Sequence, residues 1–215
     1  LDVQAILDGS SMCKSFNTPA YNQLRSAGIP VAWSSTAFTY THEKTVMIDG
    51  TSAWIMTMNS NTSSPSTNRE YLALDTDATD VAEAIAVFKA DHAMMSITPA
   101  GPLAVAPTNA RPDLVALIDS AITTRDVEGE EFSDTSSTGV VNAVARAASR
   151  GVTVHVVIAN GQLDATSVNR VKNAGAHVVM TGPSSGNGTM TNPYIHAKAI
   201  VADSTRGFVG SENFS

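Results

Sequence analysis

Residues 194–213 read YIHAKAIVADSTRGFVGSEN, and residues 40–59 read YTHEKTVMIDGTSAWIMTMN. The two stretches align without a gap at an offset of 154 positions (194 against 40). In each of them a lysine follows the histidine by two positions, an aspartate by seven and an asparagine by seventeen. At average residue usage, a single H-x-K-x4-D match is expected about once in a hundred chains of this size. Two copies with the same downstream asparagine therefore indicate an internal duplication.

Similar elements precede both stretches. Apolar runs at residues 3–7 and 152–158 are typical of strands, and helix-like segments follow at 21–26 and 167–173. Both of these helices end at an Ala-Gly pair, and glycine is the usual residue just after a helix. Each repeat is therefore predicted to run from a strand to a helix, then to a second strand and to a hairpin that carries the motif.

Further helices are predicted over residues 80–92, 112–122 and 138–150, and a short strand over 71–74. In the first of these helices Thr79 or Asp80 is expected to be the N-cap. The alternation of strands and helices predicts an α/β fold of two pseudo-twofold-related repeats, each a mixed sheet flanked by helices.

Residues 95–107 hold three prolines and a glycine, so they are the expected junction between the repeats. The first repeat is assigned to residues 1–100 and the second to residues 101–215. The second repeat has a segment, residues 101–150, before its first matched strand, and the first repeat has no counterpart. The sequence is therefore expected to be a piece of a longer protein, with the first repeat lacking its N-terminal part and the second its C-terminal part.

Composition excludes several classes of protein. The chain has 215 residues, of which 43% are hydrophobic and 15% charged, and its net charge is −7. A single cysteine, Cys13, rules out an internal disulfide and a cysteine-based zinc site. No apolar run approaches the ~18 residues of a membrane span. The acidic balance argues against a non-specific nucleic-acid binder, which normally has a basic face.

The repeated residues can form one surface in each repeat. Side chains two apart on a strand point to the same face, so His42 and Lys44 are expected to project together. Asp49 suits the hairpin bend, and the returning strand is expected to bring Asn59 back beside the pair. The second repeat offers the matching set, and the two sets together would form a symmetric site.

Two imidazoles, two ammonium groups and two carboxamides suit the cleavage of a phosphodiester. The lysines and asparagines can stabilise charge on a five-coordinate phosphorus. One histidine can attack phosphorus and form a phosphohistidine, while the other protonates the leaving alcohol. A nucleophilic imidazole needs a carboxylate on its other nitrogen, and Glu70 is expected to supply one to the first repeat. The inventory requires no cofactor and no metal.

The paired H-x-K-x4-D segments, with Asn59 and Asn213 downstream, resemble the catalytic motifs of the phospholipase D superfamily. The stretch at residues 67–70, Thr-Asn-Arg-Glu, is similar to the segment that follows the first motif in many bacterial members. The resemblance covers essentially the whole chain. It implies two α/β repeats that share one active site at their interface.

The resemblance also implies roles for individual residues. His42 and His196 would be the nucleophile and the general acid, with His42 favoured as the nucleophile. The catalytic set would be His42, His196, Lys44, Lys198, Asn59, Asn213 and Glu70. The substrate would be bound by Lys44, Lys198, Asn59, Asn213, Thr57 and Ser211, while Asp49 and Asp203 would be mainly structural.

The implied activity is that of a phosphoric diester hydrolase of phospholipase D type, which cleaves a phospholipid headgroup and allows peripheral contact with a membrane. Phosphatidyl transfer, as in cardiolipin synthases, and nucleic-acid cleavage are the alternatives, and the acidic balance disfavours the second of them. A non-catalytic binding module is a different class. Because both motifs lie on one chain, a monomer can hold a complete site. The composition suits an exported bacterial enzyme and is also compatible with the cytoplasm.

Overall fold

The computed structural model describes residues 1–161, 164–184, 186 and 188–215. The chain packs as two compact units. The first comprises Leu1–Glu43, Met47–Ala53 and Thr76–Leu103; the second comprises Lys44–Val46, Trp54–Asp75 and Ala104–Ser215. The passage from Leu103 to Ala104 lies inside the proline-containing stretch at 95–107. These units are defined by packing, and the repeat boundary at residue 100 stays a prediction.

The first unit contains a parallel strand pair joined by a helix. Strand β1 (Ala5–Leu7) pairs with β2 (Val31–Trp33), and α1 (Lys14–Ser26) connects them. Helix α3 (Ala78–His92) begins at Asp77, whose carboxylate accepts hydrogen bonds from the backbone of Thr79 and Asp80. Those two residues were the expected caps. They are instead the donors, because an N-cap side chain accepts from the amides two and three positions ahead.

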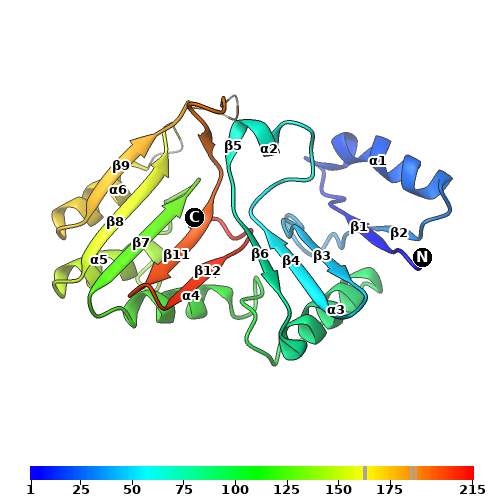
Figure 1. The fold of residues 1–215 in the computed structure, drawn as a ribbon, viewed down its shortest axis with the longest axis horizontal. Helices are drawn as coiled ribbons and strands as arrows, with labels where there is room; N and C mark the ends of the chain where they lie inside the picture. The colour runs from blue at the N-terminus through cyan, green and yellow to red at the C-terminus, as the bar shows by residue number, and fades with distance from the viewer. Residues whose placement is uncertain (162–163, 185, 187) are drawn as a thin grey trace. The chain divides into compact units, whose positions relative to one another are not determined.

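The second unit is built on a five-stranded mixed sheet in the order β12-β11-β7-β8-β9. Strands β7 (Thr124–Gly129), β8 (Thr153–Ala159) and β9 (His177–Thr181) are parallel. Strand β11 (Lys198–Ala202) is antiparallel to both β7 and β12 (Arg206–Val209). Helices α4 (Ala110–Asp119), α5 (Val140–Ser149) and α6 (Ala165–Asn173) lie along one face of this sheet, as Figure 1 shows.

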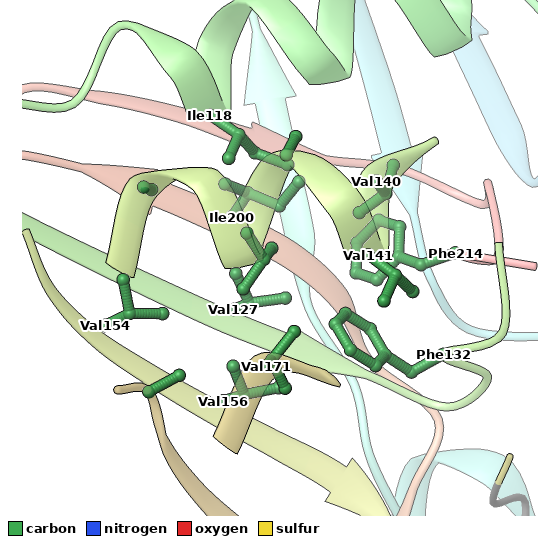
Figure 2. Packing of buried hydrophobic residues seen from close by; sticks show 14 of the residues in the cluster. Ile118, Val127, Phe132, Val140, Val141, Val154, Val156, Val171, Ile200 and Phe214 are labelled. Atoms are coloured by element: carbon green, nitrogen blue, oxygen red, sulfur yellow. The ribbon is translucent and has the colours of Figure 1, made fainter. Parts of the chain in front are cut away.

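The core of the second unit lies between this sheet and its helices. Alternate residues of each strand point inward, so Val127, Val154 and Val156 face Val141 and Val171 on the helices (Figure 2). Phe132 and Phe214 close one end of the cluster, and each is 1% exposed. Full burial of such a side chain contributes about 1.5–3 kcal/mol, so this cluster is the main source of stability for the unit.

Two smaller sheets complete the fold. Strands β3 (Thr45–Ile48), β4 (Ser52–Met56) and β6 (Leu72–Asp75) form a three-stranded sheet in the order β3-β4-β6. The short helix α2 (Ser64–Thr67) leads into β5 (Asn68–Arg69), which pairs in parallel with β10 (Tyr194–Ile195).

The predicted hairpin bends occur at the same place in both repeats. Asp49 and Gly50 have φ of 54° and 66°, and Asp203 and Ser204 have φ of 50° and 55°. Two successive residues of positive φ form the kind of tight turn that matches the twist of paired strands. The duplicated sequence therefore folds into a duplicated turn.

Of the six motif histidines, lysines and asparagines, only Lys198 lies on a hairpin strand, as the first residue of β11, which corrects the prediction for the other five. Lys44 directly precedes β3, and His196 lies between β10 and β11. His42 lies before β3, while Asn59 and Asn213 lie beyond β4 and β12. The ladder of the first hairpin ends where Met56 N donates to Lys44 O (2.9 Å), and that of the second where Gly210 N donates to Lys198 O (3.3 Å). His42, Asn59 and Asn213 therefore lie beyond the last ladder bonds of their hairpins, whereas the backbone of His196 is held by a hydrogen bond to Arg69 O.

Asp203 ties the second hairpin to the start of β7. Its carboxylate accepts hydrogen bonds from Thr123 N (2.8 Å), Thr124 N (3.0 Å) and Ile122 N (3.0 Å), and from the Thr123 hydroxyl (2.8 Å). The backbone donors of Thr124, Thr123 and Ile122 hold the pKa of Asp203 well below its ordinary value.

We expect Asp203→Asn to lower the melting temperature at pH 7 by several degrees, because the amide loses the charge that these donors favour. A carboxylate with a depressed pKa stabilises the fold above its ordinary pKa, and this contribution is lost as the pH falls towards the folded value. The difference from the unmodified protein should therefore shrink below about pH 4. Thermal melts from pH 7 to pH 3 measure it, with Asp49→Asn as the matched control. An equal loss in both variants, or a constant difference at all pH values, would contradict this role.

Candidate active site

The pairing of β5 with β10 brings a carboxylate and a histidine together from residues far apart in the sequence. Asn68 lies opposite Tyr194, and Arg69 lies opposite Ile195. His196 N then donates to Arg69 O (3.2 Å), which extends the register by one residue. Glu70 and His196, each directly after its strand, are therefore side by side. Both residues belong to the second packing unit, although Glu70 lies in the first sequence repeat.

The Glu70 carboxylate holds the Nδ1 atom of His196. The distances from Nδ1 are 2.9 Å to Oε1 and 3.0 Å to Oε2, and both side chains are almost fully buried. A carboxylate only accepts hydrogen bonds, so the neutral imidazole carries its proton on Nδ1 and leaves a lone pair on Nε2. We had expected Glu70 to serve the first repeat; the structure instead places it on the histidine of the second, because β5 pairs with β10.

Two further side chains fix Glu70. The Thr57 hydroxyl donates to Oε2 (2.6 Å), and Asn68 Nδ2 donates to Oε1 (3.0 Å). Burial acts to raise the pKa of Glu70, but the hydrogen bonds from His196, Thr57 and Asn68 outweigh it and lower the pKa below the ordinary value. Glu70 is therefore an ionised acceptor at neutral pH, as the orientation of His196 requires.

Lys198 lies on the same side of the chain as His196 and is fully buried. Its Nζ donates to Glu130 Oε2 (2.8 Å) and to the carbonyl of His196 (2.7 Å). Burial lowers the pKa of Lys198, and the charge of Glu130 partly offsets this effect. A buried ammonium group needs such a counter-ion, since an unpaired buried charge costs several kcal/mol, on the order of 3–5.

Glu130 is the site residue that the sequence did not reveal. Besides Lys198, its carboxylate accepts from the Tyr194 hydroxyl (2.8 Å) and lies 3.4 Å from His196 Nε2. From the sequence, the acidic run at residues 128–134 is most simply a solvated face, although the family resemblance places that region near the rim of the site. The sequence does not predict strand β7, whose last residue, Gly129, pairs with Lys198 and directly precedes Glu130. A predicted strand there would have placed Glu130 at the end of the sheet, beside Lys198.

A polar cavity of about 250 Å3 opens in front of His196. His196 and Glu130 are the ionisable groups of its lining apart from the phenol of Tyr194. The remaining lining residues are uncharged: Asn59, Asn61, Ser63, Ser64, Asn68 and Gly186. Asn59, a predicted site residue, therefore lies at the same cavity as His196, and the two come from different repeats.

The other predicted site residues differ in how far they are buried. Lys44 is buried, and Ser211 and Asn213 are half-buried. Thr57 is fully buried, and its hydroxyl serves Glu70, so its contact with a substrate stays a prediction. His42 lies in the first packing unit and is exposed. Its part in the same reaction also stays a prediction.

Metal and membrane signals can be assessed for the described residues. Within residues 1–161, 164–184, 186 and 188–215, no three His, Cys, Asp or Glu side chains are grouped so that they could hold a metal ion. In the same part of the chain, none of the helices combines the length and the apolar character that a membrane crossing requires.

The chain is similar to solved structures of other proteins. Among solved structures, the chain is similar to the polyphosphate kinase of Porphyromonas gingivalis, with a TM-score of 0.66 and 13% identity, over 100% of this chain and 37% of the kinase chain. It is also similar to NucT from Helicobacter pylori, with a TM-score of 0.38 and 22% identity, over 48% of this chain and 66% of NucT. The first likeness supports the fold alone, and the second is too low to carry an argument. The chain spans less than two thirds of either protein.

No curated protein sequence matches the chain. A family described as "Cardiolipin synthase, PLD-like domain" matches residues 1–92 and 114–215, a span that includes both copies of the histidine motif. This match confirms the resemblance to the phospholipase D superfamily and the α/β fold with two repeats. Because it covers most of the sequence, the chain belongs to the family of PLD-like domains that carries this cardiolipin synthase description.

Proposed function

We propose that the chain cleaves the headgroup phosphodiester of a phospholipid by phospholipase D-type hydrolysis. The observation that carries the proposal is His196, whose Nδ1 is held by Glu70 and which lines a polar cavity. Its Nε2 lies 3.4 Å from Oε2 of Glu130, the carboxylate that pairs with Lys198. An imidazole whose Nδ1–H is held by a carboxylate can gain and lose a proton at Nε2, so it is suited to proton transfer at a phosphate ester. Membership of the family supports a phosphodiesterase or transferase reaction.

The proposed reaction has two displacements at phosphorus. The neutral imidazole of His42 attacks phosphorus and the bond to the headgroup oxygen breaks, while protonated His196 gives its proton to the leaving alcohol. Water then attacks the phosphohistidine, and His196 takes its proton. The nitrogen–phosphorus bond breaks, which releases the phosphomonoester and restores both histidines. The proposal requires His42 and His196 to flank one phosphorus atom.

Phosphatidyl transfer is the second candidate, favoured by the description of the matching family. It differs only in the second step, in which an alcohol replaces water and a new diester forms. The net charge of −7 disfavours a nuclease, because a nucleic-acid backbone is bound largely through positive charge. A non-catalytic module is disfavoured because no motif histidine, lysine or asparagine is lost in either repeat.

Removal of either motif histidine should abolish turnover without unfolding the protein. We expect His42→Ala and His196→Ala each to lower kcat by a factor of about 10³ or more, since removal of a reacting group leaves only binding and electrostatic effects. Hydrolysis of bis(p-nitrophenyl) phosphate measures this, with thermal melts to verify folding. His155→Ala is the matched control, since His155 is an exposed histidine paired with Asp126. Near-normal turnover in either motif variant would refute the mechanism.

Glu70→Gln tests the orientation of His196. Glutamine keeps the size of the side chain but loses the charge that favours the Nδ1–H tautomer, so we expect kcat to fall by a factor of about 10²–10⁴ with a much smaller change in KM. Glu128→Gln is the control, because Glu128 contacts the Tyr71 hydroxyl (2.7 Å) and not His196. Equal effects of the two substitutions, or a change confined to KM, would contradict an orienting role.

A substrate panel tests the proposed lipid specificity. Phosphatidylcholine, phosphatidylglycerol and plasmid DNA are offered in parallel, with and without ethanol. We expect release of the headgroup from a phospholipid, and phosphatidylethanol with ethanol present if transfer competes with hydrolysis. Cleavage of DNA alone would contradict the lipid assignment, but it would still be consistent with a phosphodiesterase reaction.

A further inference from the structure

Glu130 has its carboxylate beside His196, the histidine that the proposed function places at a bound phosphate. Its Oε2 atom is 2.8 Å from Lys198 Nζ and 3.4 Å from Nε2 of His196, the atom that donates the proton in the proposed reaction. The side chain also lines the cavity in front of His196. Any anion that enters this cavity therefore meets Glu130 at close range.

The cavity holds little charge that could compensate a strongly anionic ligand. The part of its lining that the structure describes has one carboxylate, Glu130, and one imidazole, His196, among uncharged Asn, Ser and Gly residues and the Tyr194 phenol. Lys198 is not among these lining residues, 0% of its side chain is exposed, and Glu130 already neutralises it. A second negative charge on the ligand would be repelled by Glu130 in a partly buried site, where charges are screened much less than in water.

Burial acts to raise the pKa of Glu130. The charges of Lys198 and His196 and the hydrogen bonds from Lys198 and Tyr194 outweigh this effect, so the pKa lies below the ordinary value. The repelling charge is thus present at neutral pH.

We propose that Glu130 selects the charge of the bound phosphate, so that a phosphodiester monoanion is admitted and a phosphomonoester dianion is disfavoured. This inference rests on the proposed function of the same site. It gives Glu130 a role on both sides of the reaction, because hydrolysis of a diester produces a monoester whose second ionisation lies near pH 6. Glu130 thereby weakens the binding of the product relative to the substrate, a discrimination achieved by repulsion rather than by added contacts.

The test compares two probes that differ by one methyl group. Methyl phosphate is largely a dianion at pH 8, while dimethyl phosphate is a monoanion. Their dissociation constants are measured by 31P NMR for the unmodified protein, Glu130→Gln and Asp126→Asn. Asp126→Asn is the matched control, because it also removes one carboxylate. Asp126 lies on β7, but it is exposed and pairs with His155.

In Glu130→Gln we expect the dissociation constant of methyl phosphate to fall by a factor of about ten, and that of dimethyl phosphate to change by less than about threefold. Asp126→Asn should change neither, and Glu130→Asp should keep the discrimination. Weaker binding of both probes to Glu130→Gln would mean that Glu130 serves only to keep Lys198 charged. An equal fall in both dissociation constants would mean that Glu130 does not discriminate between ligands by charge. Either result overturns the proposal.

The unmodified protein provides a second test if Glu130→Gln fails to fold. It should bind dimethyl phosphate at least as tightly as methyl phosphate, although a lysine-containing site without Glu130 would prefer the dianion. Tighter binding of methyl phosphate would overturn the inference. Since these measurements do not depend on turnover, charge-selective binding without any diester hydrolysis would reject the proposed function and leave the role of Glu130 intact.

Discussion

The hydrogen bond between Glu70 and His196 is the interaction on which the candidate site depends. It exists only because two residues of β5 pair with two residues of β10, which sets a segment of the first repeat against a segment of the second. The same pairing sets Asn68 opposite Tyr194, and both residues line the cavity together with Asn59. Without the β5–β10 pairing, His196 would still belong to the sequence motif. It would lack the carboxylate that fixes its tautomer and the polar residue Asn68 that lines the cavity with it.

Burial determines how the rest of the site is charged. Lys198 has no exposed side-chain surface, so its ammonium group requires an internal partner, and Glu130 supplies one. The Lys198–Glu130 pair is therefore nearly neutral before a ligand enters, and Glu70 adds a negative charge behind a neutral His196. A site of this kind can bind a singly charged phosphodiester through hydrogen bonds and local charge without attracting polyanions in general, which is consistent with the net charge of −7.

The duplication allowed much of the fold and of the site to be predicted. The hairpin turns at Asp49 and Asp203 and the helices other than the short α2 follow from local signals. Strand β7 did not, because its inward positions include Arg125, which is buried and donates to the carbonyls of Leu117 and Ile118 at the end of α4. The partner of His196 could not be inferred either, since the pairing of β5 with β10 joins residues 126 positions apart through strands of only two residues.

The tautomer of His196 is the most direct test of this account. In 15N-edited NMR spectra recorded at a pH where the imidazole is neutral, His196 should carry its proton on Nδ1 and show an unprotonated Nε2, and this preference should weaken in Glu70→Ala. A proton on Nε2, or a tautomer that is indifferent to the loss of Glu70, would contradict the claim that a carboxylate of one repeat prepares the histidine of the other for chemistry.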